Sequence, residues 1–497
     1  MMRTRPATGW AIALTAVLGV LAGCGPTGAR SDGPNGRTQQ TPAAGAPVVI
    51  DGSVDEWTEL LEARADSETI ALRFSSPVPG EALQAASRTT TIAIDLDDDP
   101  TTGRRIAGAG GGAGDSTMGA EVLVELSPAN EDRPSRPGRG ARVTIIDAGG
   151  ARTIDHTESG LIFLPTYAAD AYELRLDRAA LPESTGRARA RVISAGRGVT
   201  GGGAVFQVPV RSGPVFPSAM VPDRAAGGLR VMSHNVLRSS PRREPDAFAR
   251  LYKALKPDVL LVQEWDGADE AELIDWFEEH VGDGPWHAAS DAARGVSIVS
   301  RHPVVTRVGM GEGGEQLRQS GGERPPRATL AVVRTPVGDV LVGSLHLKCC
   351  GGAGTAEDQR RIREAEAVRA TIEALFETRA GSSIAHVVLG GDLNLVGTRT
   401  PLDVLRTGVD LDDSELAVAP TPTLGRRDWA TWHGRAGGSF TPGRLDYLVW
   451  SDASSDASAS FALDTEALPP SELSRLGLTG EETSASDHLP LVLDLVD

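Results

Sequence analysis

The stretch Ser486-Asp487-His488-Leu489-Pro490-Leu491-Val492-Leu493-Asp494-Leu495 decides the fold, because it places a polar pair directly before a mostly apolar run. The run predicts a buried strand. The polar approach places Asp487 and His488 at the mouth of that strand, where an imidazole can face solvent. One such pair is not specific, so its meaning depends on where polar side chains fall on the other strands.

Five further segments carry a carboxylate, an amide or an imidazole at a strand end. Burying such groups costs free energy unless they are paired, so their repeated placement predicts that they face one cavity. The polar residues of these segments are Asn235, Glu264, His346, the pair Asp392 and Asn394, and Asp446.

The C-terminal half, residues 229–497, alternates short apolar strands with helices. Helices are predicted at 246–255, 270–280 and 357–377, the last with apolar residues about one turn apart. Hairpins separate some strands and helices separate others. This pattern predicts two sheets packed face to face with helices outside.

The strand-end motifs occur in a fixed order that resembles one known superfamily. They are the first strand ending in Asn235, Gln263-Glu264, Ser344-Leu345-His346, Gly391-Asp392-Leu393-Asn394, Arg444-Leu445-Asp446-Tyr447 and Ser486-Asp487-His488-Leu489-Pro490. Together they resemble the endonuclease/exonuclease/phosphatase superfamily, which has the deoxyribonuclease I-like fold. The resemblance implies a four-layered α/β sandwich and metal-dependent cleavage of phosphate esters.

The resemblance also implies roles for these residues. Glu264, helped by Asn235 and Asp487, is expected to hold Mg²⁺ or Mn²⁺ on hard oxygen ligands. His488, oriented by Asp446, is expected to act as the general base on water.

Three more residues receive roles from the same resemblance. Asp392 and Asn394 are expected to position the nucleophile and the scissile phosphate. His346 is expected to donate to a phosphate oxygen or to help protonate the leaving group. Four other histidines match no motif and are predicted to be structural, namely His234, His302, His386 and His433.

The substrate is less clearly indicated. Trp265 follows Glu264 where abasic-site endonucleases usually carry Thr, and Leu237 stands where they carry an acidic residue. The net charge of −18 argues against non-specific coating of nucleic acid. We predict a phosphodiesterase or nuclease, with sphingomyelinase-like phospholipase C or phosphatase activity as the alternative. A cell-surface binding protein with an inactive hydrolase-like domain is the alternative of another class.

The N-terminal half, residues 48–210, consists of short segments with period-two alternation between turns rich in Gly, Pro and Asp. This pattern predicts an all-β antiparallel sandwich. Val49-Ile50-Asp51-Gly52-Ser53 and the run from Ile94 to Gly103 resemble family 9-like carbohydrate-binding modules and DOMON-type sandwiches. The resemblance implies a glycan ligand, although the aromatic candidates for a sugar platform are few.

Two small clusters leave alternatives open. The acidic residues Asp95 and 97–99 can supply oxygen ligands to a structural Ca²⁺, or they can form a turn satisfied by water and backbone amides. Cys349 and Cys350 can form a strained ring disulfide or stay as two thiols.

The N-terminal segment is typical of export. Residues 1–23 combine a basic start with a short apolar run, and Leu21-Ala22-Gly23-Cys24 looks like a bacterial lipobox. Lipidation of Cys24 would anchor the protein to the membrane of the cell envelope, at the outer membrane or cell surface, with residues 24–47 as a flexible tether. An ordinary secretory peptide is the alternative. Residues 211–228 are predicted to link the two halves.

Overall fold

The computed structural model describes residues 48–496, with gaps at 108–116, 131–136, 195–196, 199–202, 210–218, 311–323, 413 and 435–436. The predicted signal peptide, the tether and Cys24 lie outside the described residues. Residues 211–218 of the predicted linker lie outside them too. No helix among the described residues is long and apolar enough to cross a membrane.

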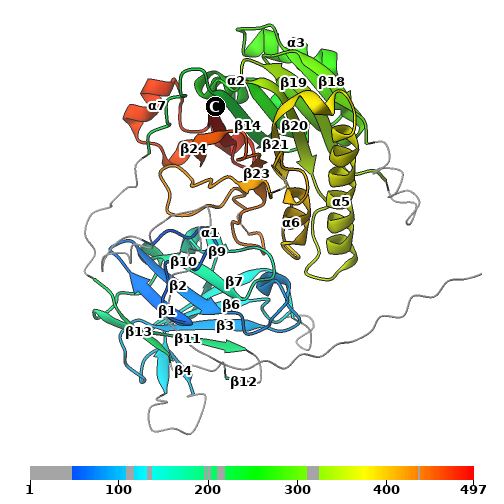
Figure 1. Cartoon of the computed structure of the whole chain (residues 1–497). Helices are drawn as coiled ribbons and strands as arrows, with labels where there is room; N and C mark the ends of the chain where they lie inside the picture. The colour runs from blue at the N-terminus through cyan, green and yellow to red at the C-terminus, as the bar shows by residue number, and fades with distance from the viewer. Residues whose placement is uncertain are drawn as a thin grey trace, which may run out of the picture. The chain divides into compact units, whose positions relative to one another are not determined.

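The N-terminal half contains two large antiparallel sheets that share one apolar core (Figure 1). A further two-stranded sheet pairs β4 (Arg104–Ile106) with β5 (Met118–Ala120). The strand order is β1-β2-β10-β9 in one sheet and β12-β11-β3-β6-β7-β8 in the other, where β13 also pairs with β11. Alternate side chains such as Leu72, Ile94 and Leu174 fill the core between them. The predicted all-β antiparallel sandwich is therefore confirmed. Its strands are β1 (Leu61–Ala65), β2 (Thr69–Ser75), β3 (Thr90–Asp95), β6 (Val122–Leu126), β7 (Ala141–Asp147), β8 (Gly150–Ile154), β9 (Ile162–Leu164), β10 (Ala171–Asp177), β11 (Arg187–Ser194), β12 (Arg197–Gly198) and β13 (Ala204–Gln207).

The C-terminal half contains two six-stranded sheets. Their orders are β16-β17-β15-β14-β25-β24 and β18-β19-β20-β21-β23-β22, and β14 with β15 and β20 with β21 are parallel pairs. The first sheet comprises β14 (Leu229–Asn235), β15 (Val259–Gln263), β16 (His287–Asp291), β17 (Val296–Ser300), β24 (Asp456–Ala462) and β25 (Leu491–Val496). The second comprises β18 (Val304–Val308), β19 (Ala328–Thr335), β20 (Gly338–His346), β21 (Ile384–Asp392), β22 (Ala417–Val418) and β23 (Asp446–Trp450).

These two sheets pack face to face, with helices on both outer sides (Figure 1). Leu261, Val342 and Leu493 belong to the apolar layer between the sheets. Helices α2 (Pro245–Leu255) and α3 (Glu270–His280) share a core with the first sheet, and α5 (Ala356–Phe376) and α6 (Thr400–Arg406) share one with the second. The predicted four-layered α/β sandwich is confirmed.

Strands at the sheet edges were not predicted from the sequence. β18 is at best half-buried along its length, and β24 begins with exposed or half-exposed residues. An edge strand has a neighbouring strand along only one of its edges, and more of its side chains are exposed to solvent. Its sequence therefore shows a weaker apolar pattern than that of a central strand. The helix predicted at 357–377 is correct to within a residue, because Thr355 caps its start and accepts a hydrogen bond from the amide of Asp358.

The described residues of both halves belong to one compact unit. Ile50 of the sandwich exchanges backbone hydrogen bonds with Arg427 and Trp429. Arg175 of β10 forms a buried ion pair of 3.0 Å with Asp428. Apolar residues of both halves also share a small core, which includes Ile50, Trp57, Leu164 and Ala430.

A close approach of β20 and β21 requires glycine at Gly391. This residue has a φ of +144°, and a Cβ added there would lie 1.9 Å from the carbonyl oxygen of Leu345. The next pair in the parallel register is His346 and Asp392. The glycine therefore lets the two polar strand ends lie side by side.

We expect Gly391→Ala to reduce the free energy of unfolding by about 3 kcal/mol, because the backbone must move to relieve the overlap. Chemical denaturation measures the change. Gly150→Ala is the matched control, since Gly150 also has a positive φ of +113° but has no atom within 4 Å of an added Cβ. An equal loss in both variants would show that the close approach costs nothing.

Candidate active site

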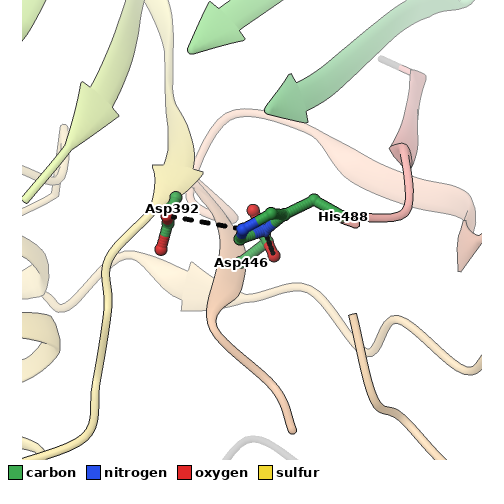
Figure 2. Close-up of side chains that lie close together, drawn as sticks. All are labelled: Asp392, Asp446 and His488. Atoms are coloured by element: carbon green, nitrogen blue, oxygen red, sulfur yellow. Dashed lines mark hydrogen bonds and ion pairs between the residues drawn. The ribbon is translucent and has the colours of Figure 1, made fainter. Parts of the chain in front are cut away.

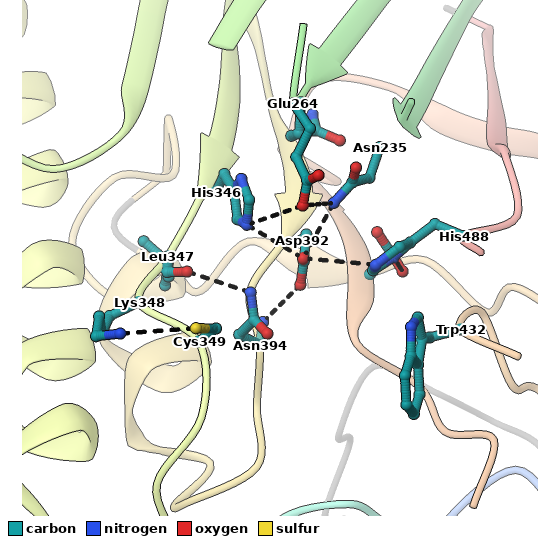
Figure 3. Close-up of polar contacts among 12 residues, drawn as sticks. Asn235, Glu264, His346, Leu347, Lys348, Cys349, Asp392, Asn394, Trp432 and His488 are labelled. Carbon is teal, nitrogen blue, oxygen red and sulfur yellow. Dashed lines mark hydrogen bonds and ion pairs between the residues drawn. The ribbon is translucent and has the colours of Figure 1, made fainter. Parts of the chain in front are cut away.

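The polar strand ends meet at one edge of the two sheets (Figure 3). Asn235, His346 and Asp392 are the last residues of β14, β20 and β21, and Glu264 follows β15. Asp446 begins β23 and His488 precedes β25, and these two strands run antiparallel to their neighbours. The carboxyl ends of β14, β15, β20 and β21 and the amino ends of β23 and β25 therefore lie at the same edge.

His488 lies between two buried carboxylates (Figure 2). Its Nδ1 lies 2.8 Å from Asp446 Oδ2, and its Nε2 lies 3.8 Å from Asp392 Oδ2. With Nδ1 donating to Asp446, the lone pair of Nε2 is left for a proton from another group. The Asp446 carboxylate thereby fixes the orientation of the ring.

Ser486 ties the His488 segment to the neighbouring strand. Its Oγ donates to the carbonyl of Asn235 at 2.7 Å and accepts from the amide of His488 at 3.2 Å. Ser486 therefore holds the backbone of His488 next to the end of β14.

Four further site residues lie around Asp392 (Figure 3). Asn235 Nδ2 donates to Glu264 Oε1 and to Asp392 Oδ2, each at 3.2 Å. His346 Nε2 lies 3.4 Å from Asp392 Oδ2 and 3.8 Å from Glu264 Oε1. The backbone N–H of Asn394 donates to Asp392 Oδ1 at 2.9 Å. Asp392 is thus the carboxylate to which the others converge.

Two site residues have backbones in the left-handed region. Glu264 has a φ of +64° and Asn394 a φ of +49°. Glu264 accepts the backbone amide of Arg238 at 3.0 Å. A non-glycine residue with positive φ is uncommon, and such strain gathers where a side chain must be aimed.

The charges at the site oppose one another. Burial raises the pKa of Asp392 to about 7, and the carboxylates of Asp446 and Glu264 add to the rise while His488 opposes it. Burial would lower the pKa of His488, but the charges of Asp446 and Asp392 raise it to about 10. Burial lowers the pKa of His346, helped by the nearby Arg327 and His488, so that imidazole is neutral.

The donor set fits a divalent cation with hard oxygen preference. Ligand atoms of Asp392, Asp446 and His488 lie within 4.8 Å of one another. The predicted ligands Glu264 and Asn235 adjoin this group through Asp392, and the predicted ligand Asp487 lines the same cavity. A bound cation would offset the carboxylate charge that now raises the pKa of Asp392. Which of these residues hold it stays a prediction.

Two residues of the predicted acidic cluster of the sandwich, Asp95 and Asp97, form a similar grouping with Glu121, which was not predicted. Ligand atoms of Asp95, Asp97 and Glu121 lie within 4.8 Å of one another. Thr102 Oγ1 donates within this cluster, and Glu121 accepts the amide of Leu96 at 2.8 Å. Local donors therefore satisfy part of the cluster, and a calcium ion there stays a prediction.

Thr431 and Trp432 were not identified from the sequence. Thr431 Oγ1 lies 2.7 Å from Asp446 Oδ2 and accepts the amide of Asp446 at 3.0 Å. The indole of Trp432 donates to Asp487 Oδ2 at 3.3 Å. Both lie in a long segment without periodicity. The only available signal was a cluster of two tryptophans, Trp429 and Trp432, in a chain with few aromatic residues.

Two of the four histidines without motifs, His234 and His386, are buried. His234 is buried against Phe248 and Tyr252, and burial lowers its pKa to about 3. His386 contacts Ser454 Oγ and the carbonyl of Val337, each at 3.0 Å. The structural roles of all four histidines stay a prediction.

The loops that follow β20 and β21 are held by a buried ion pair on α5. Arg361 and Asp358 are fully buried and lie 3.2 Å apart. Arg361 donates to the carbonyls of Lys348 and Cys350, and Asp358 accepts the amide of Thr398 at 3.0 Å. Cys349 and Cys350 are free thiols in this structure, and Cys350 is exposed.

The fold and the site define a hydrolase class. Two facing mixed sheets carry carboxylates, amides and two imidazoles at one edge, beside a cavity of about 360 Å³. Residues 232–488 match the Endonuclease/Exonuclease/phosphatase family, and the chain belongs to that family. Its C-terminal half therefore has the deoxyribonuclease I-like fold, and the protein is a hydrolase of phosphate ester bonds.

The solved structures to which this chain is similar are distant in sequence. A family protein from Bacteroides thetaiotaomicron is 15% identical over 54% of this chain and 94% of its own, with a TM-score of 0.36. An AP endonuclease from Archaeoglobus fulgidus is 16% identical over 53% and 98%, with a TM-score of 0.35. A mutant beta toxin from Staphylococcus aureus with bound magnesium ions is 16% identical over 54% and 99%, with a TM-score of 0.33. No curated protein matches the chain.

We expect Asp446→Asn to reduce kcat/KM at least roughly tenfold and to move the acid limb of its pH profile to lower pH. The base must be neutral, so activity rises as His488 loses its proton. Removing the carboxylate that raises the pKa of His488 lets the proton leave at lower pH. The measurement is the pH dependence of kcat/KM at saturating Mg²⁺.

Asp410→Asn is the control for this profile. Asp410 is also buried and accepts a hydrogen bond from Ser451, but it does not line the cavity. An unchanged midpoint in Asp446→Asn would mean that Asp446 does not set the protonation of the base.

Proposed function

We propose that this protein is a metal-dependent phosphodiesterase that hydrolyses phosphodiester bonds with an activated water. The observation that supports it best is the placement of His488 between Asp446 and Asp392, beside Glu264 and Asn235. This arrangement offers a proton acceptor and hard oxygen ligands within one cavity.

In the proposed reaction, His488 Nε2 takes a proton from water while the water oxygen forms a bond to phosphorus. The bond between phosphorus and the leaving ester oxygen breaks, and that oxygen takes a proton. The products are a phosphomonoester and an alcohol. Asp446 holds the ring of His488 and stabilises its protonated form.

The remaining residues act on the phosphate. Asn394 lies next to Asp392 and can donate to a phosphate oxygen from its side chain. His346 is neutral and can donate an N–H to the phosphate or to the leaving oxygen. Glu264, Asn235 and Asp487 would hold Mg²⁺ or Mn²⁺, with Asp392 adjoining them. The ion, when bound, neutralises charge on the phosphate and lowers the pKa of bound water.

Other functions make different predictions. A sphingomyelinase-like phospholipase C or phosphatase would use the same residues on a different ester. An inactive binding protein would have no need of the Asp446–His488 hydrogen bond or of a strained Glu264 backbone. Export, the anchor at Cys24 and a glycan ligand of the sandwich stay predictions.

Hydrolysis of bis-p-nitrophenyl phosphate is the direct test. We expect activity with Mg²⁺ or Mn²⁺, its loss with EDTA and its return when the metal is restored. His488→Ala should reduce the rate by roughly two to four decades, because the reaction loses its general base.

His302→Ala is the matched control, since His302 is half-buried beside Asp258 and lies outside the cavity. We expect it to keep the wild-type rate. The enzyme hypothesis fails if purified, folded protein shows no metal-dependent hydrolysis and His488→Ala behaves like wild type.

A further inference from the structure

The cavity beside His488 is lined by both halves of the chain. Five of its lining residues come from the β-sandwich, and we call them the sandwich wall. The sandwich wall consists of Ala82, Gln84, Ala85, Arg139 and Thr166.

Gln84 fixes the sandwich wall to one loop of the hydrolase half. Its side-chain nitrogen donates to Thr441 Oγ1 at 2.9 Å, and its oxygen accepts the amide of Thr441 at 3.0 Å. Both residues are buried. A reciprocal pair of buried hydrogen bonds is costly to break, because separation would leave polar groups unsatisfied. The wall is therefore held in place next to the segment that carries Trp432.

Thr166 fixes the wall to a second loop, the one that follows Asn394. Its hydroxyl donates to the carbonyl of Leu395 at 2.6 Å. The amide of Ala168 donates to the carbonyl of Gly397 at 2.8 Å. The sandwich thus contacts the loop directly after the predicted phosphate-positioning residue.

Ala85 reaches a third loop, the one that carries Cys349 and Cys350. A Cβ added to Gly352 would lie 3.2 Å from Ala85 Cβ, so the two backbones are in close contact. Together, Gln84 and Ala85 connect two loops that flank the catalytic residues. The sandwich wall and these two loops therefore line the cavity together.

The size and chemistry of the cavity favour a small substrate. Its volume of about 360 Å³ lies near the lower end of the range for small-molecule pockets. Leu237, Val396 and Phe440 give it an apolar part, and Arg139 and Arg238 give it two guanidinium groups. A DNA duplex is a stiff rod that bends only at considerable cost over such short lengths. A duplex is therefore too wide and too stiff to be held inside a cavity of this volume.

We propose that the sandwich wall restricts this hydrolase to phosphodiesters with a substituent about the size of one nucleoside, and that Arg139 binds the substrate's negative charge. This inference rests on the proposed phosphodiesterase function and adds a substrate class to it. The sandwich is then part of the active site, whatever else it binds.

The first test compares substrates on the full-length protein with Mg²⁺. We expect kcat/KM for the p-nitrophenyl ester of thymidine 5′-monophosphate to exceed the value per bond for a 30-base-pair duplex by at least about a hundredfold. Equal values would overturn the restriction while leaving the phosphodiesterase function intact. Failure to hydrolyse even bis-p-nitrophenyl phosphate would instead overturn the proposed function.

The second test changes the sandwich wall. Arg139→Gln should raise KM for the thymidine ester about fivefold to twentyfold and change kcat less than twofold. The substitution removes a positive charge that binds the substrate but lies away from the reacting atoms. Arg152→Gln is the matched control, an exposed arginine of the sandwich outside the cavity. Equal KM values in both variants would overturn the role of Arg139.

The third test fills the cavity from the sandwich side. Ala85→Trp should reduce kcat/KM for the thymidine ester at least about tenfold and raise its KM more than that of the smaller bis-p-nitrophenyl phosphate. Ala151→Trp, on the exposed strand β8, is the control for adding an indole to the sandwich. Thermal unfolding confirms that each variant is folded. A folded Ala85→Trp protein with wild-type kinetics would show that the sandwich wall does not face the substrate.

Discussion

The hydrogen bond between His488 and Asp446 crosses from one sheet of the hydrolase half to the other. His488 precedes β25 of the first sheet, and Asp446 begins β23 of the second. Their separation of 2.8 Å therefore depends on how the two sheets pack. The apolar layer between the sheets, which includes Leu448 and Leu491, sets the distance between the two groups. Packing of the core is in this sense part of the catalytic geometry.

A second link between the sheets lies beneath the site. Gln263 of the first sheet donates to Ser344 Oγ at 2.9 Å, and Ser344 donates back to the carbonyl of Val262 at 2.8 Å. Both side chains are buried. These two bonds explain why a glutamine precedes Glu264 and why a serine stands two residues before His346. Polar residues one step below the site hold the two sheets in register with each other.

The site could be predicted from the sequence where its residues end strands. Asn235, Glu264, His346, Asp392 and His488 adjoin apolar runs, and the order of these runs resembles one superfamily. Since a strand's direction determines where its end lies, their convergence follows from the topology. The β-sandwich and the four-layered α/β sandwich could also be predicted, because their central strands are apolar on the faces they bury.

The rest could not be predicted, because it depends on loops that meet only in three dimensions. Thr431 and Trp432 lie in a segment whose spacing has no period, and their partners Asp446 and Asp487 are 15 and 55 positions away. Gln84 is 357 positions from Thr441, and nothing in its surroundings marks it as part of a catalytic cavity. Edge strands such as β18 also escaped, since half of each faces solvent.

The buried ion pair of Arg175 and Asp428 has a consequence for how the protein can vary. Separating the two halves would break this buried ion pair together with the reciprocal hydrogen bonds between Gln84 and Thr441. The two halves are therefore expected to unfold in a single cooperative transition and not as two independent domains. A substitution deep in the sandwich can thus lower the amount of working enzyme without touching the chemistry. Neither half is a freely exchangeable module, and each must change in step with the other.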